Sequence, residues 1–442
     1  MKQSLQKWFS TEFFLSSFNQ KIGKSEFRKN LMLMIGGSAF SQLIPILLSF
    51  FLARLYSPSD FGVLSNYLSI MGFLVVVMFL KYELAIVLPK KDTIAANLVV
   101  LCLLIGLIIG ILFTLIFYFF DDTFYTLLKI DKKQNFLILV PIGALAYSIL
   151  NLINEWFVRK KNFKSLIGNK VTNNTMIIFL SGMFAIPSFN AKNLGLVKGQ
   201  IIGQIFAIVS AVLFVFKKEK SLFRSIDLRI MKRLFHKYRD FAKFNIPGQL
   251  FNSISGQLLI WYMTVYFGLG VVGLYMFMDR IMGAPLAFVG NAVKDVFKQK
   301  ASVEYREKGE CINLYKRTSF LLAGLVLIPF IILFFFAPDI FALFFGEQWR
   351  ESGIYARIFI VANLLNFITM PTGWLFVIAE KQQQDMFWQV INLSCTVISL
   401  LLSYFLFKDN VIASLICIAV AKCISYTIQM LMTYYLALGK LK

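Results

Sequence analysis

The sequence predicts an all-α polytopic membrane protein, and three observations support this fold class. Hydrophobic residues make up 58% of the chain and charged residues only 15%, whereas a soluble domain carries about 25% charged residues. Apolar runs recur along the whole chain, each close to the roughly 20 residues that a spanning helix needs. The basic residues gather in every second connection between these runs, as the positive-inside rule requires of a multi-pass protein.

Twelve apolar segments define the predicted spanning helices in order. They cover residues 31–53, 61–88, 94–119, 136–157, 167–187, 194–216, 241–267, 271–296, 314–337, 352–379, 386–407 and 411–437. A long polar stretch divides them into six helices on each side. We therefore expect a cytoplasmic N-terminal segment (1–30), an N-terminal lobe (31–216), a cytoplasmic connector (217–240) and a C-terminal lobe (241–438).

The distribution of charge decides the topology. The formal net charge is +22, and about 32 of the 45 Lys and Arg residues fall in the segments on the N-terminal side of the membrane. Both termini are therefore expected on the cytoplasmic side of the membrane. The basic excess is explained by topology and by contact with anionic lipids, so we expect membrane lipids and no nucleic acid among the partners. The first 30 residues lack an apolar core followed by a cleavage site, so we expect no cleaved signal peptide.

The connector (Lys217–Asp240) has the pattern of a basic amphipathic helix. Its apolar residues recur near helical spacing with Arg and Lys between them, which is typical of a helix that lies on the inner leaflet. These apolar residues are Leu222, Phe223, Ile226, Ile230, Leu234 and Phe235.

The two halves of the chain resemble each other. A shift of 211 residues places "SQLIPILLSFFLARLYSPSDFGVL" (Ser41–Leu64) over "NSISGQLLIWYMTVYFGLGVVGLY" (Asn252–Tyr275). Each stretch is a helix and a short turn, after which Gly62 or Gly273 opens the next helix. Parallel six-helix repeats related by an axis along the membrane normal are an architecture of transporters.

Three charged residues lie deep inside predicted spans. Asp279 and Arg280 stand near the middle of segment 271–296, and Lys422 near the middle of segment 411–437. A charge at a helix centre costs about 2.5–3.5 kcal/mol even on the lenient insertion scale. Arg280 and Lys422 are therefore the strongest candidates for a binding site, and the alternative is a buried ion pair that fixes helix packing.

Lys81 and Glu83 interrupt the second apolar segment, "FLKYELAIVLPKKD" (Phe79–Asp92). The predicted helix 61–88 would be about 42 Å long, against a hydrocarbon core of roughly 30 Å. Both charges therefore fit the cytoplasmic headgroup layer as well as they fit a site. Residues two apart on a helix point to opposite sides, so each is expected to need a partner on another helix or water.

Other polar side chains in or near the spans have open interpretations. Arg54, Lys170, Lys198 and Arg357 stand close to helix ends, where snorkelling explains them as well as function does. Glu155 and Arg159, four residues apart, predict a local salt bridge. Amides in the second half can bind helices together or bind sugar hydroxyls. These amides are Gln249, Asn252, Gln257, Asn363, Asn366, Gln389 and Asn392.

The sequence lacks the motifs of several catalytic and cofactor sites. "IGKS" (Ile22–Ser25) is similar to the end of a phosphate-binding loop, but Phe18 stands where that loop requires its first glycine. His236, the single histidine, lies in the connector, and the five cysteines have no zinc-binding spacing. We therefore expect no bound cofactor and no direct use of ATP.

Three stretches carry a resemblance to a known family. "FFLARLYSPSDFGVLSNY", "KYELAIVLPKKDTIAANLVVL" and "VVGLYMFMDRIMGAPLAFVGNAVKDVFKQKASVEY" resemble the polysaccharide-transporter branch of the multidrug/oligosaccharidyl-lipid/polysaccharide (MOP) exporter superfamily. This branch contains the O-antigen type (Wzx-like) flippases of bacterial inner membranes, and the resemblance extends over essentially the whole chain.

The resemblance implies a fold and a cargo. The fold is two six-helix lobes around a central cavity, as in MATE-like exporters, working by alternating access. The cargo is an oligosaccharide repeat unit on undecaprenyl pyrophosphate, carried across the bacterial inner membrane for O-antigen or other surface polysaccharide, and coupled to H⁺ or Na⁺. Candidate protein partners are a polysaccharide polymerase and a chain-length regulator.

The resemblance also implies roles for the charged residues. Lys81, Arg280 and Lys422 would bind the lipid pyrophosphate, with Arg54, Arg357 and Lys170 as further cations of the site. The family more often has Arg at the position of Lys81, so a bidentate contact is not expected there. Glu83 and Asp279 would carry the coupling ion.

Competing functions make different demands on the sequence. A drug or small-molecule antiporter of the same superfamily should have a more apolar or acidic cavity. A polysaccharide polymerase or ligase should have a large outer loop with catalytic side chains, whereas the outer loops here are short. Peptidoglycan lipid flippases usually have fourteen helices, which is more than the twelve predicted here. Transport of a lipid-linked glycan is therefore the leading prediction, by a transporter and not an enzyme.

Overall fold

The computed structural model describes residues 49–186, 194–219, 226–239 and 241–440, and every regular element in these ranges is a helix. The predicted all-α fold is therefore confirmed. Most of the first predicted span (31–53) lies outside the described residues, although the helix that ends it is seen from residue 49 to residue 55. Leu222 and Phe223 of the connector also lie outside them.

The first helical bundle contains five long helices and one short helix. They are α4 (Pro58–Met78), α5 (Asp92–Phe119), α6 (Asp121–Leu128), α7 (Leu139–Arg159), α8 (Phe163–Phe184) and α9 (Gly195–Glu219). Helix α4 begins with a capping box, in which the Ser57 hydroxyl oxygen accepts from the Asp60 backbone N–H at 3.3 Å and the Asp60 carboxylate accepts from the Ser57 backbone N–H at 2.8 Å. Helices α8 and α9 pack backbone to backbone, because a Cβ atom on Gly203 would lie 2.5 Å from the Ile177 nitrogen.

The second bundle is built on a long, interrupted helix. Its elements are α11 (Ile246–Lys308), α12 (Ile312–Phe345), α13 (Arg350–Thr372), α14 (Leu375–Ile378), α15 (Gln382–Phe407) and α16 (Val411–Ala437). Helix α11 is two helices joined at Gly268, whose φ of 82° is in the left-handed region that favours glycine. This break falls in the short turn predicted between segments 241–267 and 271–296. Eight helices of the described ranges are long and apolar enough to span a membrane.

The described part of the connector forms a short helix, α10 (Leu228–Lys237), against the first bundle. Met231 and Leu234 are buried, whereas Leu228 is 74% exposed. The Asp227 backbone N–H donates to the side-chain oxygen of Asn97 on α5 at 2.8 Å. The basic side chains of α10 are exposed, and the inner-leaflet position of this helix stays a prediction.

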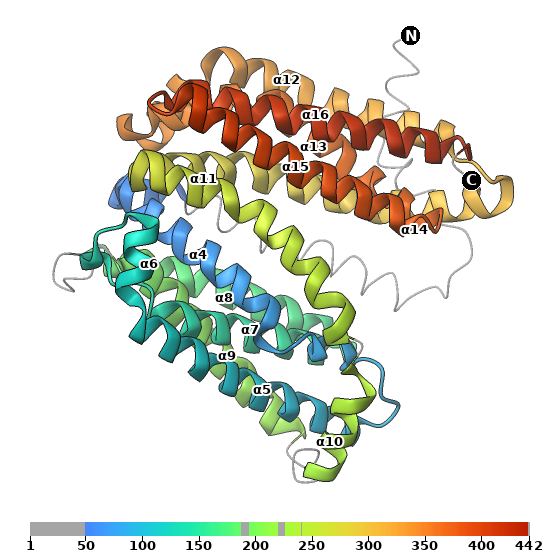
Figure 1. Cartoon of the computed structure of the whole chain (residues 1–442). Helices are drawn as coiled ribbons and strands as arrows, with labels where there is room; N and C mark the ends of the chain where they lie inside the picture. Colours follow the sequence, from blue (N-terminus) through green and yellow to red (C-terminus); the bar gives the residue numbers. More distant parts are fainter. Residues whose placement is uncertain (1–48, 187–193, 220–225, 240, 441–442) are drawn as a thin grey trace.

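Figure 1 shows how the two bundles are arranged. The blue and green helices α4–α9 form one bundle, the orange and red helices α12–α16 form the other, and α11 runs between them. The bundles meet where α4 and α11 begin to pack against each other, which we call the closed end. They diverge toward α10, α14 and the chain's C-terminus, which we call the open end.

At the closed end, α4 and α11 are in backbone contact. A Cβ atom on Gly62 would lie 2.0 Å from the Leu269 carbonyl oxygen, and one on Gly273 would lie 1.7 Å from the Pro58 carbonyl oxygen. Only glycine fits at either position. Under the 211-residue repeat, Pro58 corresponds to Leu269 and Gly62 to Gly273, so the same contact is made twice. The prediction of two similar six-helix lobes thus has a direct structural counterpart.

Aromatic side chains and hydrogen bonds surround this seam. Phe61 of α4 packs edge-on against Phe277 of α11 and against Trp349, with ring centroids 5.5 and 5.1 Å apart. The Trp349 indole N–H donates to the Ala53 carbonyl at 2.8 Å. On the part of α11 before the break at Gly268, the Thr264 hydroxyl donates to the Asn66 side-chain oxygen at 3.0 Å. The closed end is therefore sealed by packing that crosses both bundles.

The seam predicts that Gly273→Ala is destabilising. The added methyl group would meet the Pro58 carbonyl, and we expect a loss of roughly 1–3 kcal/mol of stability through overpacking. Gly283→Ala is the matched control on the same helix, since its Cβ would meet no atom within 4 Å. Thermal unfolding of the purified protein in detergent measures both. Equal melting temperatures for the two variants would contradict the described contact.

Candidate functional site

The structure corrects the prediction for Lys81 and Glu83. Helix α4 ends at Met78, not at residue 88, and the next turn contains Leu80 and Lys81 with φ of 50° and 63°. A short 3₁₀ helix, η1 (Tyr82–Ala85), follows. Because Lys81 and Glu83 are not on one α-helix, they can face each other, and Lys81 Nζ lies 3.7 Å from Glu83 Oε1. The expectation that the two cannot pair was wrong, since it assumed that the helix continued.

The turn that carries this pair is strained. Left-handed conformations cost a residue with a side chain roughly 1–2 kcal/mol each, and here two such residues follow one another. Lys81 is only 8% exposed. Oε2 of Glu83 is buried and has no hydrogen-bond partner among the described residues. Burial raises the pKa of Glu83, and the charge of Lys81 counteracts part of that rise.

Contacts with distant segments hold the strained turn in place. The Tyr82 ring stacks on Phe235 of α10 with centroids 5.4 Å apart, and its hydroxyl donates to the Phe235 carbonyl at 2.8 Å. At the other end of the turn, Arg159 of α7 donates to the Ile86 carbonyl at 2.8 Å. The conformation is therefore imposed by tertiary contacts and not by local sequence preference.

Arg159 also begins an ion-pair network at the open end of the first bundle. Its guanidinium donates to Asp92 at 2.8 Å, and Lys160 binds the other oxygen of Asp92 at 2.7 Å. Glu219 of α9 lies 3.4 Å from Lys160. The predicted local pair of Arg159 with Glu155 was wrong, because Arg159 reaches Asp92 at the start of α5 instead.

Glu155 belongs to a different set of charges, which we call the first-bundle cluster: Lys81, Glu83, Glu155 and Lys170. Glu155 lies within electrostatic range of Glu83 on one side and of Lys170 on the other. The buried Cys102 thiol of α5 also faces Glu83. Sequence reasoning did not select Glu155 as a site residue, because its neighbour Arg159 offered a simpler local explanation.

The second bundle carries the other deep charges. Asp279 on α11 is exposed in spite of its position in the middle of the helix, and Lys422 on α16 lies within its electrostatic range. Arg280 makes no hydrogen bond or ion pair with the described residues. The neighbouring Gly283 faces open space, since a Cβ there would touch nothing within 4 Å. Asp279, Arg280 and Lys422 are called the second-bundle cluster below.

Two of the predicted cations lie apart from both clusters. Arg54 is exposed at the closed end, next to the Ala53 carbonyl that accepts from Trp349. Arg357 on α13 donates to the Phe335 carbonyl of α12 at 3.0 Å, and the Phe335 side chain is 61% exposed. The structure therefore does not bring Arg54 and Arg357 together with Lys81, Lys170, Arg280 or Lys422.

Three of the six predicted amides whose side chains are described bind neighbouring groups. Asn392 on α15 accepts from the Ser425 hydroxyl of α16 at 2.9 Å, and Gln389 donates to Asp385 at 3.0 Å. Asn363 donates to the Met282 sulfur at 3.7 Å. Gln257 is different, because its buried side-chain oxygen has no partner among the described residues. Asn366 and Gln249 are exposed, and the Asn252 side chain lies outside the described ones.

No set of three or more His, Cys, Asp and Glu side chains in the described ranges has the arrangement of a metal site. The two clusters instead combine lysine or arginine with carboxylates. Such an arrangement can bind an anionic group through its cations and can exchange a proton or cation at its carboxylates.

Comparison with known proteins identifies relatives of the chain. A family described as polysaccharide biosynthesis protein matches residues 51–354. No curated protein matches the chain.

Solved transporter structures share the fold. An inward-facing multidrug resistance MATE transporter of the MOP superfamily aligns with a TM-score of 0.70 and 16% identity, over 91% of this chain and 99% of that one. The lipid II flippase MurJ in an inward closed conformation aligns with a TM-score of 0.67 and 12% identity, over 93% and 91%. An outward-facing MATE transporter aligns at 0.58 and 16% identity, over 93% and 95%. These likenesses show that the chain shares the fold of these transporters.

The ion-pair network predicts that Asp92→Ala destabilises the first bundle. Arg159, whose side chain is only 8% exposed, would lose its carboxylate. Because Asp92 itself is 40% exposed, we expect a loss of about 1–3 kcal/mol, between the values for surface and buried pairs. Asp122→Ala is the control, since its side chain is 80% exposed and its loss should leave the melting temperature nearly unchanged. Equal effects of the two variants would show that the network does not hold the turn.

Proposed function

The chain belongs to the polysaccharide biosynthesis protein family, and from this premise we propose that it is a flippase for undecaprenyl-pyrophosphate-linked oligosaccharide repeat units. The fold is that of MOP-superfamily transporters, and the chain is a multi-pass membrane protein. The proposed cargo is made on the cytoplasmic side of the bacterial inner membrane and is used on the other side for O-antigen or another surface polysaccharide.

One observation carries the proposal: Arg280 has no hydrogen-bond or ion-pair partner among the described residues. It is adjacent to Asp279 in the sequence, and it lies in the same bundle as Lys422. An arginine that no described residue neutralises is costly in the membrane and is suited to a ligand with several anionic oxygens. A pyrophosphate fits this requirement, because guanidinium binds two phosphate oxygens at once and an ammonium supplies a second, more adaptable contact. The unpartnered oxygen of Gln257 is available to a sugar hydroxyl.

The two ends of the molecule support alternating access. In the proposed topology the open end faces the cytoplasm, where Lys81 lies at the end of the first bundle and attracts the lipid phosphates. The cargo then moves to Arg280 and Lys422, which lie nearer the closed end. Opening of the Gly62–Gly273 seam would release it on the periplasmic side.

Coupling to H⁺ or Na⁺ is proposed to act through the carboxylates beside these cations. Lys81 cannot bind phosphate fully while it is paired with Glu83. Neutralisation of Glu83 by a proton, or screening by Na⁺, frees Lys81. Asp279, which is within electrostatic range of Lys422, is proposed to act on that lysine through its charge. Glu155 and Lys170 influence the first of these sites through their charges.

A drug or small-molecule antiporter is the alternative, since a MATE multidrug transporter has the same fold. The deep cations favour an anionic cargo over the cationic compounds that an acidic cavity would bind. A polymerase and a chain-length regulator are proposed as partners that receive the cargo.

Deletion of the gene in its native host tests the function. We expect surface polysaccharide to be lost and complete lipid-linked repeat units to accumulate on the cytoplasmic side, measured by gels and by leaflet-resolved lipid analysis. Normal polysaccharide would favour the antiporter. Repeat units that reach the periplasm without being polymerised would favour a polymerase or ligase.

Charge variants of the second-bundle cluster test the proposed site. Complementation of the deletion by Arg280→Ala should give a flipping rate lower by about tenfold or more, because a charge-assisted contact to phosphate is lost. Arg280→Lys should retain part of the activity, and Lys422→Ala should resemble Arg280→Ala. Lys316→Ala, which removes an exposed cation outside both clusters, is the control at comparable expression. Full activity of Arg280→Ala would contradict the proposed role of Arg280 in binding the cargo.

The first-bundle cluster predicts a pH dependence. Burial raises the pKa of Glu83, so lowering the pH through this value protonates Glu83 and frees Lys81. Binding of undecaprenyl pyrophosphate to the purified protein should therefore weaken as the pH rises through the raised pKa of Glu83. The affinity of Glu83→Gln should be the same across this pH range and should equal the affinity of the wild type at low pH. Glu307→Gln, which changes an exposed carboxylate, is the control and should show the pH dependence of the wild type. An unchanged pH profile in Glu83→Gln would contradict this role.

A further inference from the structure

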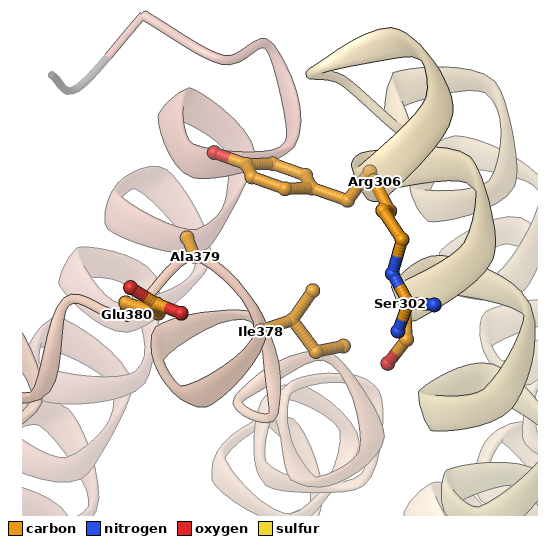
Figure 2. Close-up of a pocket in the computed structure, with 6 residues that line it drawn as sticks. Ser302, Arg306, Ile378, Ala379 and Glu380 are labelled. Carbon is orange, nitrogen blue, oxygen red and sulfur yellow. The ribbon is translucent and has the colours of Figure 1, made fainter.

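A separate pocket lies at the open end of the second bundle, away from both charge clusters. It encloses about 430 Å³ and is lined by Ser302, Tyr305, Arg306, Ile378, Ala379 and Glu380. The first three come from the end of α11 and the last three from the end of α14 and the turn before α15. Figure 2 shows Arg306 and Ser302 on one side, Ala379 and Glu380 on the other, and Ile378 between them.

The two charged walls of the pocket are not neutralised by each other. The side chains of Arg306 and Glu380 line the same pocket, yet neither side chain has an ion-pair or hydrogen-bond partner among the described residues. Their separation leaves room for a ligand between them. A purely anionic ligand would satisfy Arg306 but would face the carboxylate of Glu380, so a ligand that carries both a negative and a positive group is favoured.

The walls are fixed before any ligand binds. The Glu380 backbone is left-handed, with φ of 57°, and the Lys381 N–H donates to the Phe376 carbonyl at 2.8 Å, which closes the end of α14. Leu375 and Phe376 are buried beneath this turn in a cluster with Tyr315. On the opposite wall the Ser302 hydroxyl donates to the Lys298 carbonyl at 2.7 Å, which leaves its oxygen free to accept another hydrogen bond.

The position of the pocket matches the headgroup layer. Ser302 lies about 50 Å along α11 from the break at Gly268, at 1.5 Å per residue. The bilayer including its headgroups is about 40–45 Å thick, and membrane helices are tilted by about 20° on average. The pocket is therefore expected at the outer edge of the headgroups at the open end, and Ile378 and Tyr305 provide apolar contact.

We propose that this pocket binds a phosphate ester that carries an ammonium group, supplied as the headgroup of phosphatidylethanolamine. Arg306 binds the phosphate, Glu380 binds the ammonium, and the acyl chains follow the apolar surface of the second bundle. Because the lipid bridges the end of α11 and the α14–α15 turn, it stabilises the open end of this bundle. The proposal stands on the pocket alone and does not require the flippase function.

Native mass spectrometry of the full-length protein tests the proposal. The protein is released from vesicles that contain equal amounts of phosphatidylethanolamine and phosphatidylglycerol with the same acyl chains. We expect the wild type to retain phosphatidylethanolamine, and Arg306→Gln and Glu380→Gln each to retain it less by about tenfold or more. Glu380→Gln should in addition gain phosphatidylglycerol. Lys308→Gln, an exposed basic residue at the same helix end, is the control and should behave as wild type.

Three outcomes would overturn the proposal. The first is preferential retention of phosphatidylglycerol by the wild type, and the second is equal retention of phosphatidylethanolamine in all variants. The third is displacement of the lipid by micromolar glycerophosphoethanolamine, which would show that the pocket binds a soluble phosphoethanolamine ester and not a lipid headgroup. Melting temperatures of the variants confirm folding, and both substituted side chains are exposed. Polysaccharide export in the deletion host is measured separately, so a failure of the flippase proposal leaves this test intact.

Discussion

The backbone contact between α4 and α11 at Gly62 and Gly273 determines the arrangement of the whole molecule. Helices that touch at their backbones can separate only together with the bundles that carry them, so in this structure the bundles are joined at this end and diverge toward the other. Asp279 lies only six residues beyond Gly273, about 9 Å along the helix. The second-bundle charges are consequently held just inside the sealed end, where a cargo admitted from the open end would come to rest.

The two halves share their backbone plan but differ in charge. Under the 211-residue repeat, the positions of Asp279 and Arg280 on α11 correspond to Leu68 and Ser69 on α4. The charged residues of the second bundle are therefore not required by the repeated architecture. Their cost in the membrane has to be offset by something specific to this half, which agrees with a binding role.

The sequence was sufficient to predict the helices and their grouping, because apolar periodicity and the distribution of Lys and Arg depend on local composition. It was also sufficient to place the break in α11 near Gly268. It could not predict that α4 ends at Met78, since the apolar composition continues to Leu88 and the turn is held by Phe235 and Arg159. The choice of Asp92 over Glu155 as the partner of Arg159, and the isolation of Arg280, depend on helix rotation and tertiary packing.

The seam at Gly62 and Gly273 also bears on how charge is divided between the halves. Pro58 meets Gly273 as Leu269 meets Gly62, which is the self-complementary contact that two identical subunits make across a two-fold axis. Here both sides of the contact belong to one chain, so the two halves need not carry the same residues. One half can therefore hold Asp279 and Arg280 where the other has Leu68 and Ser69, whereas a symmetric dimer would have to accommodate every such charge twice.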